Sequence, residues 1–346
     1  MKRRPKNIVV IRLSAMGDVV MISPIIAKIL EQYPDVNITM VTSPQFVPFF
    51  QDIEGVSVFS VDLRNDYKGK RGIFRLFLDI KRLHRVDAII DLHDVIRTKI
   101  LRALFRLTMK KVYVIEKGRS DKKQLCLQKN KVFRPLRRTI DRYYDCFQKA
   151  GFIVDRIYKI KNDPKPMSTT ASKLLGKKES VWLGIAQFAQ HKGKVYPINL
   201  MEQVIEKLST HNNLKIMLFG GGKEERFITE NLAEKYPQCV SIIGKLSLRE
   251  ELALISNLDC MVSMDSSSAH MAGINGVKVI TIWGATHPYA GFLTYGQNEE
   301  DVISVNLECR PCSVFGNKPC YKESYECMYS ISPAMVIEKI ENVLSL

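Results

Sequence analysis

The sequence predicts an α/β protein built from two doubly wound parallel-sheet domains. Short apolar stretches alternate with helical patterns along the whole chain, and polar or glycine-rich loops follow many of these stretches. A segment rich in Pro, Ser and Thr near residues 161–172 interrupts the alternation. Alternating strands and helices are typical of parallel sheets. We therefore expect domains at 1–165 and 166–346, with a last amphipathic helix at 333–346 that could cross back to the first domain.

The composition is that of a globular protein. The chain has 346 residues, of which 46% are apolar, and no apolar run approaches the roughly 20 residues of a transmembrane helix. Arg12 interrupts the first apolar run, which favours a strand over a signal peptide. We therefore expect a cytoplasmic protein, in which the eight cysteines are thiols or metal ligands rather than disulfides.

The net charge of +16 is concentrated in the first half of the chain. Residues 1–165 hold 35 Lys and Arg against 17 Asp and Glu, whereas 166–346 hold 17 against 19. This asymmetry favours a polyanionic partner of the first half, such as nucleic acid, an anionic membrane surface or an acidic substrate; a solvated surface is the alternative. Residues 64–85 combine a basic loop with a basic amphipathic helix. Residues 97–142 hold sixteen Lys and Arg against three acids, but too few aromatic residues for a nucleic-acid stacking platform.

In the first half, the predicted strands are Asn7–Leu13, Asn37–Val41, Val56–Val61 and Ala88–Leu92, with helices between them and a last helix at Thr139–Ala150. The loop after the first strand contains Gly17 and Asp18. Because Ser23-Pro24 suits the start of a helix, we expect Gly17-Asp18 in a loop or an irregular first turn at the carboxyl end of that strand. Asp18 can cap this turn, or it can act as a catalytic base facing a cleft.

In the second half, the predicted strands are Val181–Ala186, Leu214–Phe219, Val240–Ile243, Cys260–Met264 and Val277–Trp283, with helices that begin near Pro197 and Ser247. Gly220–Gly222 let the backbone approach a ligand, and a carboxylate just after them can hold ribose hydroxyls; a tight turn is the alternative. Asp265–Ser268 precede a helix whose first turn carries His270. The free N–H groups of such a helix start suit a phosphate, although a plain helix cap is the alternative.

Five segments together carry a resemblance to a known family, in order and over essentially the whole chain. They are RLSAMGDVVMISP near the start, KVYP at 194–197, GGGKEE at 220–225, GKLSLREELALI at 244–255 and the later SMDSSSAHMAGINGVKVITIWGATHP. The chain resembles the bacterial lipopolysaccharide heptosyltransferases of glycosyltransferase family nine. The resemblance implies a GT-B fold, with two Rossmann-like domains facing a cleft. It also implies a nucleotide sugar, ADP-heptose in the characterised members, on the second domain, an acceptor on the first, and inverting transfer without a metal or another cofactor.

The resemblance also assigns residues. It matches Asp18 to the general base, Lys194 to the lysine on the diphosphate and Glu224 to the approximate position of a ribose-binding acid. Leu246 would lie along the adenine. The residues expected around the diphosphate and sugar are Asp265, Ser266, Ser267 and His270. In the basic segment, the residues expected to contact the acceptor are Arg64, Lys68, Lys70 and Arg71, which suit a phosphorylated and carboxylated lipid-sugar at the inner face of the cytoplasmic membrane.

Two departures from the family pattern bear on the donor sugar. Tyr196 stands where many members have Trp, and Ser267 stands where many have Gly. A separate feature is a group of four cysteines within nineteen residues, namely Cys309, Cys312, Cys320 and Cys327. Only the first pair has the spacing of a zinc knuckle, so a zinc site and free thiols that stabilise a compact loop are both open.

The sequence therefore predicts an inverting, metal-independent glycosyltransferase that moves heptose from ADP-heptose to the inner core of lipopolysaccharide. We expect it to contact the inner membrane peripherally and to bind no nucleic acid. One alternative keeps the enzyme class and changes the nucleotide sugar. The other is a basic nucleic-acid-binding protein built on a doubly wound sheet.

Overall fold

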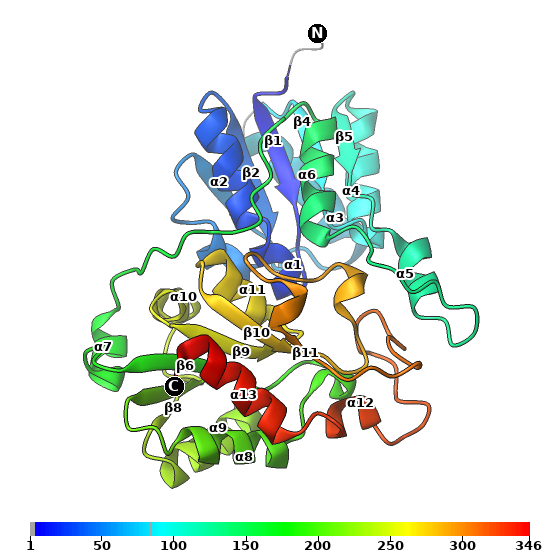
Figure 1. Ribbon diagram of the computed structural model, residues 1–346. Coiled ribbons are helices and arrows are strands. Elements are labelled where there is room, and N and C mark those ends of the chain that lie inside the picture. The colour runs from blue at the N-terminus through cyan, green and yellow to red at the C-terminus, as the bar shows by residue number, and fades with distance from the viewer. Residues whose placement is uncertain (1–3, 84) are drawn as a thin grey trace. The chain divides into compact units, whose positions relative to one another are not determined.

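The computed structural model describes residues 4–83 and 85–346, which form two compact α/β units (Figure 1). The first unit extends to Lys117 and includes Arg137–Ile157, and the second comprises Gly118–Leu136 and Tyr158–Leu346. The division therefore differs from a single boundary at residue 165. Gly118–Leu136 groups with the second unit because the ammonium of Lys131 and the backbone N–H of Leu136 donate hydrogen bonds to backbone carbonyls of that unit.

A five-stranded parallel sheet forms the centre of the first unit. Its strands are β1 (Asn7–Ile11), β2 (Asn37–Thr42), β3 (Val56–Ser60), β4 (Ala88–Asp91) and β5 (Lys111–Val114), in the order β3-β2-β1-β4-β5. Ile8 of β1 is paired with Ile38 on one side and Ala88 on the other. The strand order reverses between β1 and β4, and ligands of doubly wound sheets bind at the carboxyl ends of strands at such a point.

The helices of the first unit cover this sheet. They are α1 (Met16–Val20), α2 (Ser23–Gln32), α3 (Gly69–Leu83), α4 (Ile96–Leu107) and α6 (Thr139–Lys149), together with the 3-10 helix η1 (Pro44–Phe49). α3 and α4 lie side by side (Figure 1). The rings of Phe77 and Phe105 meet edge to face between these helices, with 4.9 Å between their centroids. Both rings belong to a core cluster that includes Val9 and Ile11 of β1.

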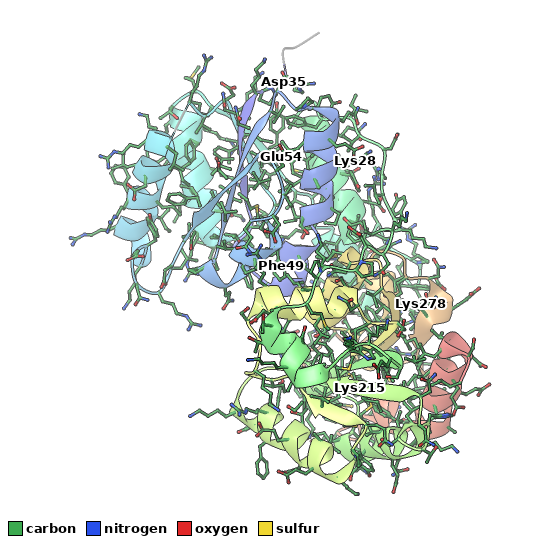
Figure 2. All side chains as sticks on the ribbon, turned by 90° about the vertical axis from the view of Figure 1, so that its left-hand side faces the viewer. Lys28, Asp35, Phe49, Glu54, Lys215 and Lys278 are labelled. Atoms are coloured by element: carbon green, nitrogen blue, oxygen red, sulfur yellow. The ribbon has the colours of Figure 1, made fainter. Side chains whose placement is uncertain are left out.

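A six-stranded parallel sheet forms the centre of the second unit. Its strands are β6 (Val181–Ala186), β7 (Leu214–Leu218), β8 (Cys239–Ser241), β9 (Cys260–Met264), β10 (Lys278–Ile282) and β11 (Val302–Ile303), in the order β11-β10-β9-β6-β7-β8. Here the order reverses between β6 and β9. Lys278, labelled in Figure 2, forms an ion pair of 2.5 Å with buried Asp301, which fixes the short edge strand β11 beside β10.

The helices of the second unit include α5 (Arg119–Leu125), α7 (Thr169–Leu175), α8 (Ile198–Leu208), α9 (Lys223–Lys235), α10 (Leu248–Ser256), α11 (Ser267–Ile274), α12 (Glu326–Tyr329) and α13 (Pro333–Leu344), with the 3-10 helices η2 (Lys192–Lys194), η3 (Pro288–Ala290) and η4 (Glu299–Asp301). The expectation that the last helix crosses back is wrong. α13 packs on α8 and β9 and buries Val336 and Ile340 in the core of the second unit. Two Rossmann-like units confirm the predicted fold class. Among the described residues, no helix is both long and apolar enough to cross a bilayer.

Candidate functional site

In the first unit, Arg12 and Asp18 form an ion pair at the carboxyl end of β1. Arg12 is buried, and its guanidinium also donates to the carbonyl oxygens of Ser14 at 2.6 Å and Leu92 at 2.5 Å. Burial lowers the pKa of Arg12, but nearby acidic groups, Asp18 first, outweigh burial and raise it, so Arg12 is a permanent cation. Asp18 lies within the short helix α1, and 24% of its side chain is exposed. Tyr143 of α6 donates its hydroxyl to the backbone oxygen of Asp18 at 3.0 Å.

His93 approaches the same loop from the end of β4. Its Nδ1 accepts from the backbone N–H of Leu13 at 3.4 Å, which leaves Nε2 to donate to Ser14 Oγ at 3.2 Å. Burial, assisted by the charge of Arg12, lowers the pKa of His93 to about 3. The imidazole is therefore neutral near pH 7 and cannot be the cation of this site. Sequence reasoning missed it because its proximity to Asp18 depends on the pairing of β1 with β4.

The two other carboxylates near this loop are engaged by one arginine. Arg102 of α4 lies 3.1 Å from Asp91 and 2.9 Å from Asp94. Asp91 also accepts the backbone N–H groups of His93 and Asp94, each at 2.9 Å. These contacts fix the turn after β4, and Asp18 is more exposed than either Asp91 or Asp94.

The predicted acceptor contacts lie together in the first unit, between β3 and the first turn of α3. Arg64, Lys68, Lys70 and Arg71 are all exposed. Asp62 accepts the backbone N–H groups of Arg64 at 2.8 Å and Asn65 at 3.1 Å, which orders the start of the segment. Because β3 is parallel to β1, this basic segment leaves the same edge of the sheet as the Asp18 loop.

In the second unit, Lys194 and Asp265 form an ion pair of 2.8 Å between their side chains. Lys194 ends η2, which follows β6, and Asp265 follows β9, so the pair spans the place where the strand order reverses. The two side chains are 16% and 7% exposed. The backbone N–H of Ala285 donates to the carbonyl of Gly193 at 2.9 Å, which ties η2 to the loop after β10.

The other residues predicted around the diphosphate begin α11. Ser266 occupies the helix cap and makes no side-chain cap hydrogen bond; its hydroxyl lies 3.0 Å from that of Ser263. Ser267 is the first helical residue and is partly exposed, and His270 is buried on the first turn. The structure therefore brings Lys194, Asp265 and the start of α11 together, with helix N–H groups that suit an anion.

Glu224 and Leu246 lie at the carboxyl ends of β7 and β8. Glu224 is exposed on the first turn of α9, whereas Leu246 is buried. Glu225 instead folds back, and its carboxylate accepts the backbone N–H of Gly221 at 2.6 Å. A side chain at Gly220 would meet the Glu225 carboxylate at 2.7 Å, so glycine lets this carboxylate pack closely against the loop.

Sequence reasoning missed Gln187, the first residue after β6. It is 1% exposed, and neither its amide nitrogen nor its amide oxygen has a hydrogen-bond partner among the described residues. A buried amide normally has partners, so an unsatisfied one at the reversal of strand order indicates contact with a ligand or water. The sequence feature that could have identified Gln187 is a polar residue directly after a buried central strand.

The segment between β11 and α12 supports Lys194. Gly316 adopts the left-handed conformation with φ +73, and a side chain there would meet Cγ of Lys194 at 2.5 Å, so the lysine stem lies against this segment. Buried Arg310 donates to the carbonyl oxygen of Gly284 at 2.6 Å and to that of Trp283 at 2.9 Å. These contacts hold the segment against the loop after β10.

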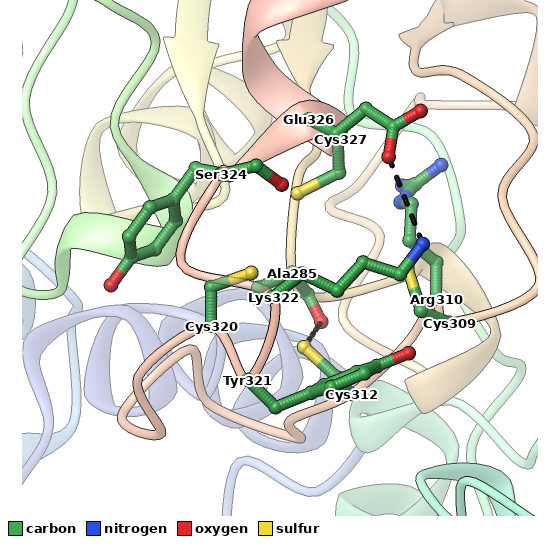
Figure 3. Close-up of a pocket in the computed structure, with 11 residues that line it drawn as sticks. Ala285, Cys309, Arg310, Cys312, Cys320, Tyr321, Lys322, Ser324, Glu326 and Cys327 are labelled. Atoms are coloured by element: carbon green, nitrogen blue, oxygen red, sulfur yellow. Dashed lines mark hydrogen bonds and ion pairs between the residues drawn. The ribbon is translucent and has the colours of Figure 1, made fainter.

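Four cysteines of this region line one small pocket (Figure 3), namely Cys309, Cys312, Cys320 and Cys327. All are free thiols. Across the described ranges, no three His, Cys, Asp or Glu side chains are arranged to hold a metal ion. Burial raises the pKa of Cys327 to about 11, so this thiol is protonated near pH 7.

Comparison with known proteins places the chain in a family. The sequence pattern of glycosyltransferase family 9 (heptosyltransferase) matches residues 76–322, more than two thirds of the chain. The chain belongs to glycosyltransferase family 9. It is therefore a glycosyltransferase, and membership favours this activity over the alternative of a nucleic-acid-binding protein.

Two heptosyltransferases and a family 9 glycosyl transferase resemble this chain over nearly its whole length. Lipooligosaccharide heptosyltransferase 2 of Campylobacter jejuni is 21% identical over 333 residues, which are 95% of each chain. The crystal structure of a family 9 glycosyl transferase from Veillonella parvula has a TM-score of 0.76 at 17% identity, covering 100% of this chain and 99% of the other. E. coli heptosyltransferase WaaC with ADP-2-deoxy-2-fluoro heptose has a TM-score of 0.68 at 16% identity, covering 97% and 99%. The solved structures share the fold.

Tyr196, one of the predicted departures from the family pattern, lies in the core of the second unit. Tyr196 is fully buried, and its hydroxyl donates to the backbone oxygen of Ile331 at 2.8 Å. Tyr196 therefore joins the loop between η2 and α8 to the segment before α13. Its identity bears on packing beneath Lys194.

Proposed function

We propose that this family 9 enzyme transfers heptose from ADP-heptose to the inner core of lipopolysaccharide, with inversion and without a metal ion. The names of the Campylobacter relative and of the E. coli structure support a nucleotide-activated heptose as donor. In this chain, the observation that carries the proposal is the Lys194–Asp265 pair at the start of α11. A cation and free helix N–H groups at one place suit the diphosphate that leaves the sugar.

The second unit holds the donor. Lys194 donates to the diphosphate oxygens, and Asp265 fixes the lysine. The first-turn N–H groups at Ser266 and Ser267 bind the same charge, and His270 lies beside the sugar. These groups take up the negative charge that develops on the leaving group, which is the part a divalent cation plays in other transferases.

The rest of the nucleotide lies along the carboxyl ends of the neighbouring strands. Leu246 provides an apolar contact for the adenine, and the exposed carboxylate of Glu224 accepts hydrogen bonds from ribose hydroxyls. Gln187 contributes its amide to the same donor, which would satisfy the two buried atoms that lack partners.

The first unit supplies the base. Asp18 accepts the proton of the acceptor hydroxyl as that oxygen bonds to the anomeric carbon and the bond from that carbon to the diphosphate breaks. Arg12 holds the Asp18 carboxylate in place. A retaining reaction through a glycosyl-enzyme needs a second carboxylate as nucleophile. Asp91 and Asp94 are buried and paired with Arg102, which favours direct displacement and inversion.

The acceptor is an anionic lipid-sugar that contacts the exposed cations of the basic segment, Arg64, Lys68, Lys70 and Arg71. Phosphate and carboxylate groups of an inner-core sugar pair with such cations. Peripheral contact with the membrane that carries this acceptor is part of the proposal.

The test replaces Asp18 with Asn. The amide keeps the shape of the carboxylate but cannot accept the proton, so turnover with ADP-heptose and a deacylated core acceptor should fall by roughly 10²–10⁴. ADP affinity should stay within about twofold, because Asp18 takes no part in donor binding. Asp35→Asn, which removes a surface ion pair with Arg4 in the same unit, is the matched control and should turn over like the parent.

The same assay tests the other parts of the proposal. A folded Asp18→Asn variant that turns over within a few-fold of the parent would exclude Asp18 as the base. Turnover lost in EDTA and restored by a divalent cation would contradict metal independence. Activity with a UDP- or GDP-sugar but none with ADP-heptose would establish the alternative donor.

A further inference from the structure

An exposed apolar stripe runs along α4 of the first unit. Ile96, Ile100, Ala103 and Leu107 follow one another at intervals of four, three and four residues, which places them on one face of the helix. All four are exposed, Ile96 to 77% and Leu107 to 81%. A helix of a globular protein usually directs such a stripe at the core.

The core-facing side of α4 is a different one. Thr98, Leu101 and Phe105 are buried, and the Phe105 ring packs against Phe77 of α3. At 100° per residue these buried positions lie opposite the stripe. α4 therefore has two apolar faces, and the first unit covers only one of them.

Cations border the exposed stripe. On the helix surface Arg97 lies on one side of it, and Lys99 and Arg106 lie on the other. All three are exposed, α4 contains no acidic residue, and none of the three has an ion pair with an acid in the part of the chain that the structure describes. Arg102, in contrast, is directed inward to Asp91 and Asp94. The three bordering cations are thus available to an external partner.

The neighbouring helix extends this surface. α3 packs beside α4 (Figure 1). Opposite its buried side it carries Phe74, which is 52% exposed, together with exposed Lys81 and Arg82. Arg82 lies 3.6 Å from Asp79, an exposed pairing that water screens. The same mixture of apolar and basic side chains therefore appears on both helices.

We propose that α4, with the outward side of α3, is the surface through which the protein docks on an anionic lipid bilayer. In this arrangement α4 lies in the plane of the interface with the Ile96–Leu107 stripe among the headgroups. Basic amphipathic helices bind membranes by inserting apolar side chains and by attraction of Lys and Arg to anionic lipid. A protein partner is less well matched, because interface cores are depleted in charge whereas cations border this narrow stripe along its length.

Docking through the stripe would bring the proposed acceptor site close to the membrane, and the inference rests on the proposed function in this respect. Ile96 lies three residues after His93, which contacts Ser14 in the Asp18 loop. The stripe therefore begins at the edge of the sheet that carries Asp18 and the basic segment, and extends about 18 Å from it. Docking through α4 would hold this edge near the headgroup layer, where the sugar of a lipid-linked acceptor begins.

The test measures sedimentation of the full-length protein with vesicles. The parent should bind phosphatidylglycerol-containing vesicles at physiological salt and should bind phosphatidylcholine vesicles at least tenfold more weakly. The Ile96→Ser/Ile100→Ser/Leu107→Ser variant should bind the anionic vesicles at least tenfold more weakly than the parent. Arg97→Gln and Lys99→Gln should each weaken binding roughly fivefold.

Matched controls distinguish insertion of the stripe into the membrane from non-specific adsorption to vesicles and from misfolding of the variant. Phe227→Ser removes a side chain of α9 that is 66% exposed in the second unit, and it should leave vesicle binding unchanged. The stripe residues are exposed, so the triple variant should keep the parent melting temperature. Leu107→Ser alone, at the last residue of α4, provides a second variant if the triple variant is unstable.

Three outcomes would overturn the inference. They are a parent that does not bind anionic vesicles, a folded stripe variant that binds like the parent, and a parent dimer that the stripe substitutions dissociate, which would assign the stripe to a second copy of the chain. Turnover with a soluble deacylated acceptor is a separate readout. It should be unchanged in the stripe variant, and its absence in the parent would contradict the proposed function without bearing on docking.

Discussion

Substituting Lys194 with Ala tests the donor site most directly. Its ammonium lies 2.8 Å from Asp265, and the two side chains are 16% and 7% exposed, so water screens this place only weakly. A charge-assisted hydrogen bond from the lysine to a diphosphate is worth about 1.5–3 kcal/mol. Its loss should weaken ADP by roughly 10- to 150-fold. Adenosine, which lacks phosphates, should bind the variant almost as well as the parent.

The same substitution has a second effect, on stability. Without the lysine, Asp265 is a buried carboxylate that has lost its ion-pair partner, and removing one member of a buried pair costs up to about 3–5 kcal/mol. The residual exposure of Lys194 makes this an upper bound. In the double variant with Asp265→Ala no charge is left buried. It should therefore melt at a higher temperature than the single Lys194→Ala variant. A double-mutant cycle over the two single variants and the double variant gives the interaction free energy between the two side chains.

Calorimetric titration with ADP and with adenosine is the assay. Lys192→Ala is the matched control, because Lys192 lies in the same short helix but its ammonium lies 4.9 Å from the ring centroid of Tyr325. Its ADP affinity should stay within about twofold of the parent. Equal weakening of ADP and adenosine by Lys194→Ala, or a larger loss of ADP affinity in the Lys192 variant, would refute the assignment of Lys194 to the diphosphate.

Two further predictions concern the first unit. The pKa of His93 is lowered from 6.5 to about 3, chiefly by burial. Between these two pH values the unfolded chain binds a proton at His93 that the folded chain does not bind. The free energy of unfolding should therefore decrease as the pH falls from about 6.5 towards 3. In the His93→Gln variant, the denaturant midpoint should decrease less steeply with falling pH over this range than it does in the parent. An equal dependence on pH in variant and parent would contradict the burial of a neutral imidazole. Lys68→Glu with Lys70→Glu should raise the KM for an anionic acceptor while ADP affinity is kept, and salt should have the same effect on the parent. If acceptor kinetics were unchanged in this variant, the two lysines would belong to a solvated surface.

The sequence predicted the central strands and the edge strand β3, but it missed the edge strands β5 and β11. Val181–Ala186 and Cys260–Met264 match the observed β6 and β9 because buried parallel strands are continuous apolar runs with clear ends. β5, Lys111–Val114, lies in a basic region, and β11 has only two residues. Pairing with β4 and β10 defines these edge strands, and no local pattern in the sequence expresses that pairing.

The residue types of the site were predictable, but most of their partners were not. Lys194 and Asp265 are far apart in sequence, and they meet because β6 pairs with β9. Arg12 was interpreted only as an interruption of an apolar run. A buried arginine at the end of a central strand needs a counter-charge, and this physical requirement could have directed attention to Asp18 six residues later.

The ion pairs Arg12–Asp18 and Lys194–Asp265 lie where the strand order of each sheet reverses. They differ in which of the two side chains is more exposed to solvent. In the first unit, the side chain of Arg12 is 6% exposed and that of Asp18 is 24% exposed, so the arginine anchors a more accessible carboxylate. In the second unit, Asp265 is the more buried member, at 7% against 16%, so the carboxylate anchors a more accessible ammonium. Incoming ligands meet the exposed member first. Such an arrangement presents a carboxylate on one sheet and an ammonium on the other, and the proposed transfer from a nucleoside diphosphate to a hydroxyl would use both.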